Sequence, residues 1–345
     1  MSGVQMITVS ADEAEQRFDR FLRKRFPQLG QGRIEKMCRK GELRLDGARV
    51  KPAVRVEEGQ SVRVPPLPDG PAPVAATPRG ANSDDCDAIR RAVIWKDEHI
   101  IALNKPPGLA TQGGTKQTIH LVQLAEALKF DRDDAPRVVH RLDRDTSGLI
   151  LLARTGRAAA GLSKMFQSRE TVKTYWAAVA GVPRPRMATI RYGLVKAGGR
   201  GAEKMFCVHP EAVKTTEGAK RATTDYAVIE SVGQRSAWVA LRPITGRTHQ
   251  LRAHMAEMGH PIVGDGKYGG NDLTNEGDGW GSQLGGEVSR KLHLHSRSIS
   301  LPHPMKPSQK LNFVAPLPEH MERTWSFFGW RPEDALDDPF EPEEF

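Results

Sequence analysis

Apolar residues near the start of the chain repeat at helical spacing. Phe18, Phe21 and Leu22 stand at i, i+3 and i+4, which predicts one amphipathic helix, and a second helix repeats that spacing with Ile34, Met37 and Cys38. Gly41 is expected to end the second helix, because glycine tolerates the left-handed conformation of a helix C-terminus. The polar face of the second helix carries four basic residues, Arg33, Lys36, Arg39 and Lys40.

Alternating apolar positions follow these helices and predict a small sheet. Leu43-Arg44-Leu45 and Val50 flank Asp46-Gly47, a pair typical of a tight hairpin turn. Val54, Val56 and Val62-Arg63-Val64 indicate further short strands. Residues 1–65 are therefore expected to form a small helix-helix-sheet domain with one basic face.

The pattern changes twice along the rest of the chain. Prolines crowd residues 66–91, which predicts an extended linker. Residues 92–325 then alternate many short apolar runs with a few helical segments. This order favours an α+β domain with a mixed, largely antiparallel sheet. Residues 326–345 form an acidic tail, expected to lie outside that domain.

Charge adds a hypothesis about partners. The chain has 51 Lys and Arg against 42 Asp and Glu, a net charge of +9. Its last 15 residues hold seven acidic residues and one arginine, so the preceding part is more basic than this total indicates. A basic folded body suggests a polyanionic partner, of which nucleic acid is the commonest.

Several classes of protein are disfavoured. Three distant cysteines make neither a disulfide framework nor a thiolate zinc cluster, and no His-Glu-x-x-His pattern occurs, so we expect no metal. No phosphate-binding Gly-x-x-x-x-Gly-Lys loop occurs, so use of ATP is not expected. Without an apolar run of about 18 residues or a signal peptide, a cytoplasmic protein with no membrane partner is expected. No heptad offers a dimer seam, so we expect a monomer.

The densest polar motif runs from His140 to Gly148, between the apolar runs Val138-Val139 and Leu149 to Leu152. A loop held between buried strands is a place where a scaffold presents reactive groups. Within it, Asp143 has Arg141 two residues before and Arg144 one residue after. A carboxylate near guanidinium groups keeps its charge, which suits a nucleophile better than a general acid. A structural turn with an Asp–Arg ion pair is the alternative.

A second polar motif runs from Arg242 to His254. Thr245 or Thr248 could cap a helix that displays His249 and Arg252 on one face, where they could bind phosphate or pair with a carboxylate. A solvated helix face is the alternative. Separately, Lys173 to Val179 predicts a strand whose Tyr175 could stack on a base or be a core residue.

The motif His140-Arg141-Leu142-Asp143-Arg144-Asp145-Thr146-Ser147-Gly148 resembles the signature of the RluA family of RNA pseudouridine synthases. Further pieces fall in the family's order, over residues 92 to about 320. The N-terminal segment resembles the S-four-type RNA-binding domain of many such synthases. The pieces are Asn104 to Gly108, Lys173-Thr174-Tyr175, Thr245 to His254, Gly259-His260-Pro261, Leu294-His295 and His303-Pro304.

This resemblance implies a reaction and a set of roles. The family isomerises uridine to pseudouridine without metal or cofactor. Asp143 corresponds to its catalytic aspartate, Tyr175 to the tyrosine that stacks on uracil, and Arg252 to the basic partner of the aspartate. Arg141 is similar to the arginine that enters the RNA helix where the target base leaves. Other basic groups are expected to contact RNA: His140, Arg144, Arg247 and His249, together with Arg33, Lys36, Arg39 and Lys40.

Within the family, the architecture and the stretch Asn104 to Gly114 most resemble the synthases of large-subunit (23S) ribosomal RNA, the expected partner. One departure is Gln112, where the family often has histidine. Three alternatives stay open: a sister synthase acting on other ribosomal positions or on transfer RNA, a non-catalytic RNA-binding protein of ribosome assembly, and a hydrolase using Asp143. The residue that removes the carbon 5 proton is not assigned.

Overall fold

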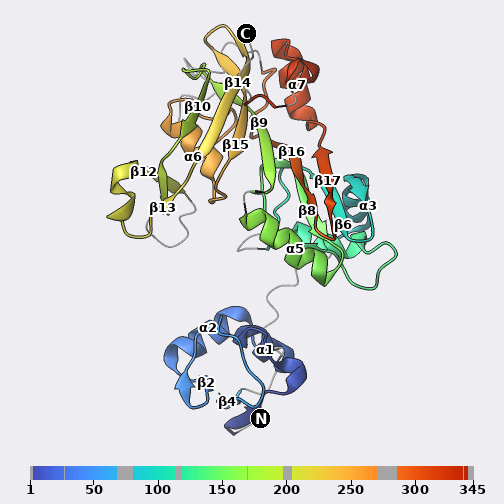
Figure 1. Ribbon diagram of the computed structural model, residues 1–345, viewed down its shortest axis with the longest axis vertical. Coiled ribbons are helices and arrows are strands. Elements are labelled where there is room, and N and C mark those ends of the chain that lie inside the picture. The colour runs from blue at the N-terminus through green and yellow to red at the C-terminus, as the bar shows by residue number, and fades with distance from the viewer. Residues whose placement is uncertain are drawn as a thin grey trace. The chain divides into compact units, whose positions relative to one another are not determined.

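The computed structural model describes residues 3–26, 28–67, 81–113, 119–168, 170–196, 204–269, 286–336 and 338–340. The chain divides into two compact units, Met1–Pro78 and Arg79–Phe345, called here the N-terminal unit and the C-terminal unit (Figure 1). Among the described residues, no helix is both long and apolar enough to cross a membrane.

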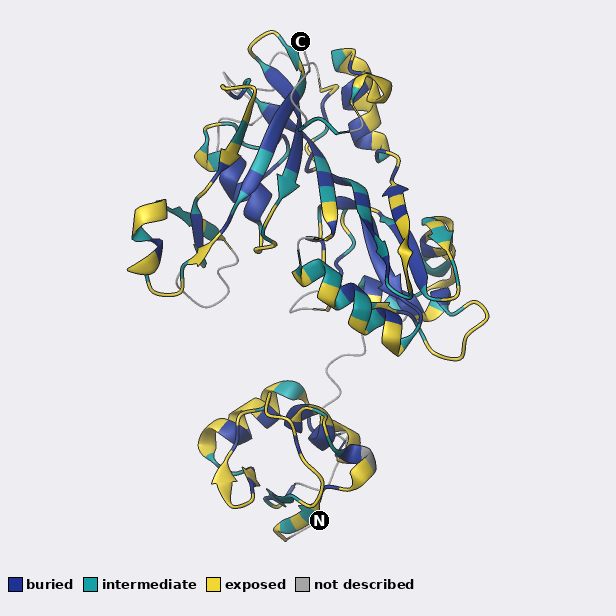
Figure 2. Cartoon of the chain, viewed as in Figure 1, coloured by how far each residue is buried: buried dark blue, intermediate teal, exposed yellow. Residues whose placement is uncertain are grey.

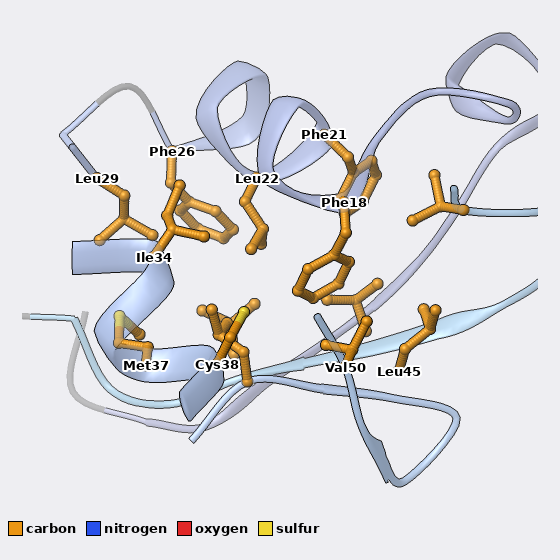
Figure 3. Close-up of a cluster of buried hydrophobic side chains, with 14 of the residues drawn as sticks. Phe18, Phe21, Leu22, Phe26, Leu29, Ile34, Met37, Cys38, Leu45 and Val50 are labelled. Carbon is orange, nitrogen blue, oxygen red and sulfur yellow. The ribbon is translucent and has the colours of Figure 1, made fainter. Parts of the chain in front are cut away.

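The N-terminal unit packs helices α1 (Phe18–Arg25) and α2 (Gln31–Lys40) on a four-stranded antiparallel sheet, and its apolar side chains form one core (Figure 3). Asp46 and Gly47 have φ angles of 48° and 78°, as a tight hairpin turn requires, and Gly41 ends α2 with φ 70°. The two predicted helices and the sheet after them are confirmed, but the sheet also contains a strand before the helices, Gln5–Thr8, that was not predicted. The strand order is β1 (Gln5–Thr8), β4 (Ser61–Val64), β2 (Arg44–Leu45), β3 (Ala48–Arg49).

The predicted strands at Val54 and Val56 are wrong. The Val54 carbonyl accepts a hydrogen bond from the Phe18 backbone, and Val56 exchanges backbone bonds with Glu15 and Gln16. These carbonyl and amide groups hold the segment before α1 instead of extending the sheet.

The C-terminal unit is built on a ten-stranded sheet whose central strands are buried (Figure 2). Its pairs are antiparallel except for β16 with β8, where His295 and Ser296 lie beside Ser147 and Gly148. The expected mixed, largely antiparallel α+β domain is confirmed. The main path is β10 (Met187–Ile190), β14 (Thr224–Val232), β15 (Ser236–Pro243), β9 (Val172–Ala180), β16 (Leu294–His303), β8 (Ser147–Ala153), β6 (Ile100–Lys105), β5 (Val93–Lys96); β17 (Lys306–Val314) joins β16 and β7 (Arg137–Val138) joins β8.

Helices and a small sheet complete this unit. The helices are α3 (Ser83–Arg91), α4 (Leu121–Leu124), α5 (Gly156–Gln167), α6 (Gln250–Glu257) and α7 (Glu319–Phe328). The three-stranded sheet has the order β12 (Met205–Val208), β11 (Gly193–Lys196), β13 (Lys220–Arg221). Short 3-10 helices span Ala11–Glu13, Ala125–Leu128, Pro210–Lys214 and Pro332–Asp334.

Two expected boundaries need correction. Part of the expected linker, 66–91, is helix α3, which begins at the capping residue Asn82 and buries Ile89 in the core of the C-terminal unit. Part of the expected acidic tail also belongs to that unit: Trp330 is buried, and Asp338 pairs with Arg242 at 2.5 Å. Apolar and ionic contacts in the fold outweigh the local composition in both places. Residues 68–80 and 341–345 lie outside the described residues.

The parallel contact between β8 and β16 depends on a glycine. Gly148 has φ 104°, and a Cβ atom there would lie 2.3 Å from the carbonyl oxygen of Ser296. No other residue fits this approach without moving a strand. The close contact fixes the point where the 140–148 motif enters the sheet.

Candidate active site

The segment that carries Asp143 is anchored to its surroundings by backbone contacts. It connects β7 to β8, and all seven residues of β8 are buried. The Thr111 hydroxyl donates to the Leu142 carbonyl at 2.7 Å and accepts from the Leu142 amide at 3.2 Å. Leu142, the residue before Asp143, is therefore held through both its amide and its carbonyl group.

Lys105 also anchors the segment that carries Asp143. Its side chain is fully buried, and its amino group donates to the carbonyl oxygens of Pro106, Leu109 and Arg144 at 2.8–3.0 Å. Burial lowers the pKa of Lys105 to about 7, although Asp145 and Asp143 oppose this shift. From the sequence, this stretch was singled out only as part of the family resemblance. A lysine at the end of an apolar run was the available signal.

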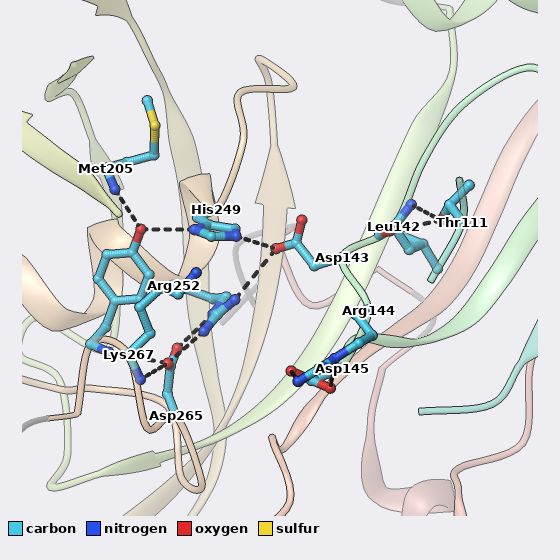
Figure 4. Close-up of polar contacts among 11 residues, drawn as sticks. Thr111, Leu142, Asp143, Arg144, Asp145, Met205, His249, Arg252, Asp265 and Lys267 are labelled. Atoms are coloured by element: carbon cyan, nitrogen blue, oxygen red, sulfur yellow. Dashed lines mark hydrogen bonds and ion pairs between the residues drawn. The ribbon is translucent and has the colours of Figure 1, made fainter. Parts of the chain in front are cut away.

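Asp143 faces two nitrogen donors of the second motif (Figure 4). Its side chain is 19% exposed, and its Oδ2 atom lies 3.7 Å from Arg252 Nη1 and 3.7 Å from His249 Nε2. The structure thus brings together residues more than 100 positions apart. The predicted pairing of this helix face with a carboxylate is what the geometry shows.

Asp265 fixes the position of Arg252. Its buried carboxylate receives two hydrogen bonds of 2.7 Å from the guanidinium group and two more from the backbone amides of Lys267 and Tyr268. Burial opposes the charge of Arg252, but the bonds and attraction of Asp265 outweigh it and raise the Arg252 pKa. No residue of 264–269 was singled out from the sequence. An aspartate between two glycines was its only local signal.

The expected threonine cap of α6 is wrong. The residue before the helix is His249, with φ 52°, and its side chain does not cap the helix. Thr245 donates its hydroxyl hydrogen to the side-chain oxygen of Gln250 at 2.7 Å. The buried side-chain amide of Gln250 therefore takes the hydroxyl hydrogen bond that a cap would give to the helix. Its oxygen also accepts a hydrogen bond from the Arg247 backbone amide.

A cavity of about 280 Å³ opens beside Asp143. Burial raises the pKa of Tyr175, in its wall, to about 12, so the phenol keeps its proton. A groove of about 1030 Å³ also reaches Asp143, and Arg144 lines it together with Arg141. The cavity is lined by seven of the residues singled out from the sequence: His140, Arg141, Asp143, Tyr175, Arg247, His249 and Arg252.

His140 is unsuited to a cationic contact with phosphate. Its Nε2 atom accepts a hydrogen bond of 2.8 Å from the Leu151 amide, and its ring stacks on Phe166 with 4.1 Å between centroids. Burial lowers its pKa to about 3. The expected contact of a charged His140 with RNA therefore needs correction. The ring is neutral, and it accepts a hydrogen bond from β8.

Among the other predicted RNA contacts, the side chain of His249 is only 8% exposed, whereas the rest are exposed. Arg144 pairs with Asp145 at 3.0 Å, and the Arg247 guanidinium donates to the Arg221 carbonyl. The other four lie on α2 in the N-terminal unit, where they stay predictions: Arg33, Lys36, Arg39 and Lys40.

Comparisons with known proteins identify the family of the chain. The family model described as RNA pseudouridylate synthase matches residues 99–257. The chain is 33% identical over 323 residues to the ribosomal large subunit pseudouridine synthase C of Haemophilus influenzae, covering 93% of this chain and 94% of that protein. The protein of the same name from Escherichia coli is 31% identical, with coverage of 93% and 95%.

A solved structure is similar as well. Human RNA Pseudouridylate Synthase Domain Containing 4 superposes with a TM-score of 0.58 and 29% sequence identity, covering 71% of this chain and 95% of that chain. The resemblance inferred from the two polar motifs is confirmed by these matches.

Proposed function

The chain belongs to the family of RNA pseudouridine synthases, and from this premise we propose that it isomerises specific uridines of large-subunit ribosomal RNA, with Asp143 as the catalytic residue. The membership makes the protein an isomerase that acts on RNA. The choice of RNA, the catalytic carboxylate and the route of the base are the proposed parts.

The observation that carries the proposal is the position of Asp143. The carboxylate lies at a cavity that also contains Tyr175 and Arg252, and the cavity volume of about 280 Å³ suits one nucleoside better than a base pair. Arg252, which Asp265 holds in place, faces one carboxylate oxygen. A single uridine can therefore meet an aromatic ring, a carboxylate and a fixed cation at once.

The reaction breaks the carbon–nitrogen glycosidic bond, turns the uracil, and joins carbon 5 to the ribose. The electron pair of the broken bond stays on N1 of the uracil. Once carbon 5 has bonded to the ribose it loses its proton, and N1 takes up a proton, so the product has the same composition as the substrate. This is a redox-neutral isomerisation, so it requires neither ATP nor a redox cofactor. The Asp143 carboxylate could add to the ribose, add to the base, or take a proton from the ribose, and all three routes need its ionised form.

Access to the uridine requires that its base leave the stack, which costs a few kcal/mol. Arg141 is exposed at the rim of the cavity, where it can take the place of the departed base, and Tyr175 can stack on the uracil. The basic residues of α2 would add affinity for the RNA backbone that falls with salt. The proteins called ribosomal large subunit pseudouridine synthase C support the choice of RNA.

The test is tritium release from large-subunit ribosomal RNA transcribed with uridine labelled at carbon 5. We expect release by the wild-type protein and a loss of at least about 1000-fold in kcat for Asp143→Asn. RNA binding, measured by filter retention, should stay within about threefold, because the substitution removes no phosphate contact.

Asp145→Asn is the matched control, since Asp145 lies two residues further along and its side chain, 43% exposed, pairs with Arg144. Equal activity of wild type and Asp143→Asn would overturn the role of Asp143. Release from transfer RNA alone would instead change the substrate. Tight binding without release from either RNA, or from partly assembled subunits, would favour a non-catalytic assembly protein.

A further inference from the structure

A chain of polar contacts connects the small three-stranded sheet to Asp143 (Figure 4). The Met205 amide, on β12, donates to the Tyr268 hydroxyl oxygen at 2.8 Å. That oxygen lies 3.0 Å from Nδ1 of His249. The other ring nitrogen, Nε2, lies 3.7 Å from Oδ2 of Asp143. His249 is thus placed between a hydroxyl group and the carboxylate.

The direction of the contact between Tyr268 and His249 depends on the tautomer of the imidazole. Burial raises the pKa of Tyr268, so its hydroxyl keeps its hydrogen. The Met205 amide already uses a lone pair on this oxygen, and the hydroxyl hydrogen needs an acceptor. Nδ1 of His249 lies within hydrogen-bond distance and can accept only when it carries no hydrogen. The neutral ring must then carry its hydrogen on Nε2, the atom that faces Asp143.

The surroundings favour the neutral ring. Burial lowers the pKa of His249, and nearby cations act in the same direction, whereas nearby carboxylates oppose it. Lys204 lies 5.5 Å from the Tyr268 ring centroid and adds positive charge on the side of the small sheet. The charged groups around the imidazole are Asp143 on the 139–146 segment, Arg252 on α6, and Asp265 and Lys267 on the following loop.

We propose that Tyr268 and His249 are positioning residues for Asp143: the Tyr268 hydroxyl fixes His249 as the Nε2–H tautomer, which donates toward Oδ2 and leaves Oδ1 for the nucleotide. Arg252 approaches the same Oδ2 atom, so both donors act on one oxygen. The separations of 3.7 Å are longer than formed hydrogen bonds, and they are expected to shorten when RNA fills the cavity.

The functional consequence concerns charge. A neutral imidazole orients the carboxylate without neutralising it. A protonated His249 would form a second ion pair with Asp143 and make the carboxylate less able to react. Tyr268 therefore protects activity below neutral pH, because its hydrogen bond to Nδ1 exists only with the neutral ring.

The role of His249 in catalysis rests on the proposed function of Asp143, but the tautomer can be measured without RNA. We would record long-range ¹H–¹⁵N spectra of the histidine-labelled full chain at pH 7.5 and assign His249 by its loss in His249→Gln. We expect the Nε2–H pattern in the wild type and its weakening in Tyr268→Phe. An Nδ1–H tautomer or a charged ring in the wild type would overturn the proposal.

Kinetics separate positioning from a merely structural role. His249→Leu should lower kcat by about 10- to 100-fold, the worth of one hydrogen bond to a charged group, with KM for RNA unchanged. His249→Gln keeps an N–H donor near the Nε2 position and should retain most of kcat. Equal losses in the leucine and glutamine variants would contradict the proposal.

The pH profile gives the sharpest readout. In Tyr268→Phe the acidic limb of kcat should move to higher pH by about 0.5–1 unit, the equivalent of one hydrogen bond. In the His249→Gln background, which cannot titrate, Tyr268→Phe should cause no such shift. A shift that persists there, or none in either background, would overturn the role of Tyr268.

If the tautomer is found but Asp143→Asn stays active, the proposed function fails and the hydrogen-bond arrangement stands.

Discussion

The two units place their charged side chains in different environments. In the N-terminal unit the core is apolar, and among its described residues only Glu13 and Asp19 are buried charged groups, each paired with an arginine that is about half exposed. In the C-terminal unit, Arg252 and Asp265 form a buried ion pair, and Lys105 is fully buried. Surface charge suits binding to a polyanion, whereas buried charge holds reacting groups at fixed positions.

Histidine distribution follows the same division. All 11 histidines lie after residue 90. Several of them are buried and neutral: burial lowers the pKa of His140, His293 and His295 to about 3. Their ring nitrogens bond the Leu151 amide on β8, the Thr324 hydroxyl on α7 and the Ser147 hydroxyl on β8. The C-terminal unit therefore depends on buried neutral histidines, and the N-terminal unit has no histidine.

The largest expected effect comes from breaking the buried ion pair. Asp265→Asn leaves Arg252 buried without its carboxylate and should cost the C-terminal unit about 3–5 kcal/mol in free energy of unfolding. Urea unfolding followed by tryptophan fluorescence measures this unit alone, because all six tryptophans belong to it. Asp19→Asn, whose partner Arg17 is half exposed, is the control and should cost the N-terminal unit about 1 kcal/mol, measured by hydrogen exchange of peptides around Leu22 because that unit has no tryptophan. Equal costs would remove the contrast between the units.

Acid should unfold the two units in different pH windows. A histidine with a folded pKa of about 3 takes up protons in the unfolded chain below pH 6.5, so the C-terminal unit loses stability between pH 6.5 and 3. Each such histidine contributes about 1.4 kcal/mol per pH unit in this window. The N-terminal unit has no histidine. Its Glu13, whose pKa Arg25 lowers to about 2 against burial, gives stability that is lost only as pH falls from 4.5 toward 2.

Tryptophan fluorescence and hydrogen exchange of peptides around Leu22 would follow the two units separately in the full chain. Loss of both signals in one shared pH window would contradict this prediction. His295→Gln, which cannot titrate, should flatten the acid limb of the C-terminal unit only.

The smallest effect per residue is expected on the basic face of α2. Replacing Arg33, Lys36, Arg39 and Lys40 by glutamine should weaken RNA binding and reduce the slope of log affinity against log salt by about 0.7–0.9 for each phosphate that is no longer neutralised. Saturating kcat should not change, since these exposed side chains lie outside the cavity. Glu35→Gln on the same helix is the control and should not weaken binding. A fall in kcat equal to the fall in affinity would contradict a pure binding role.

The amino-acid sequence was sufficient for features that depend on neighbouring residues. Helical spacing of Phe18, Phe21 and Leu22 predicted α1, and Gly41 predicted the end of α2, because side-chain period and backbone freedom are local properties. The two polar motifs identified Asp143 and Arg252 as partners through family resemblance. The structure places them 3.7 Å apart.

Features that depend on distant parts of the chain were predicted wrongly or not at all. Helix α3 and the docking of Trp330 went unpredicted, since their stability comes from packing against the C-terminal core. Asp265, Tyr268 and Lys105 were given no role from the sequence, because what makes them important is burial and a partner contributed by another segment. The sequence by itself determined α1, the end of α2, the charge and the reacting residue types. Only the tertiary structure decided which donor each buried polar group would meet, because hydrogen-bond partners are set by the fold in space.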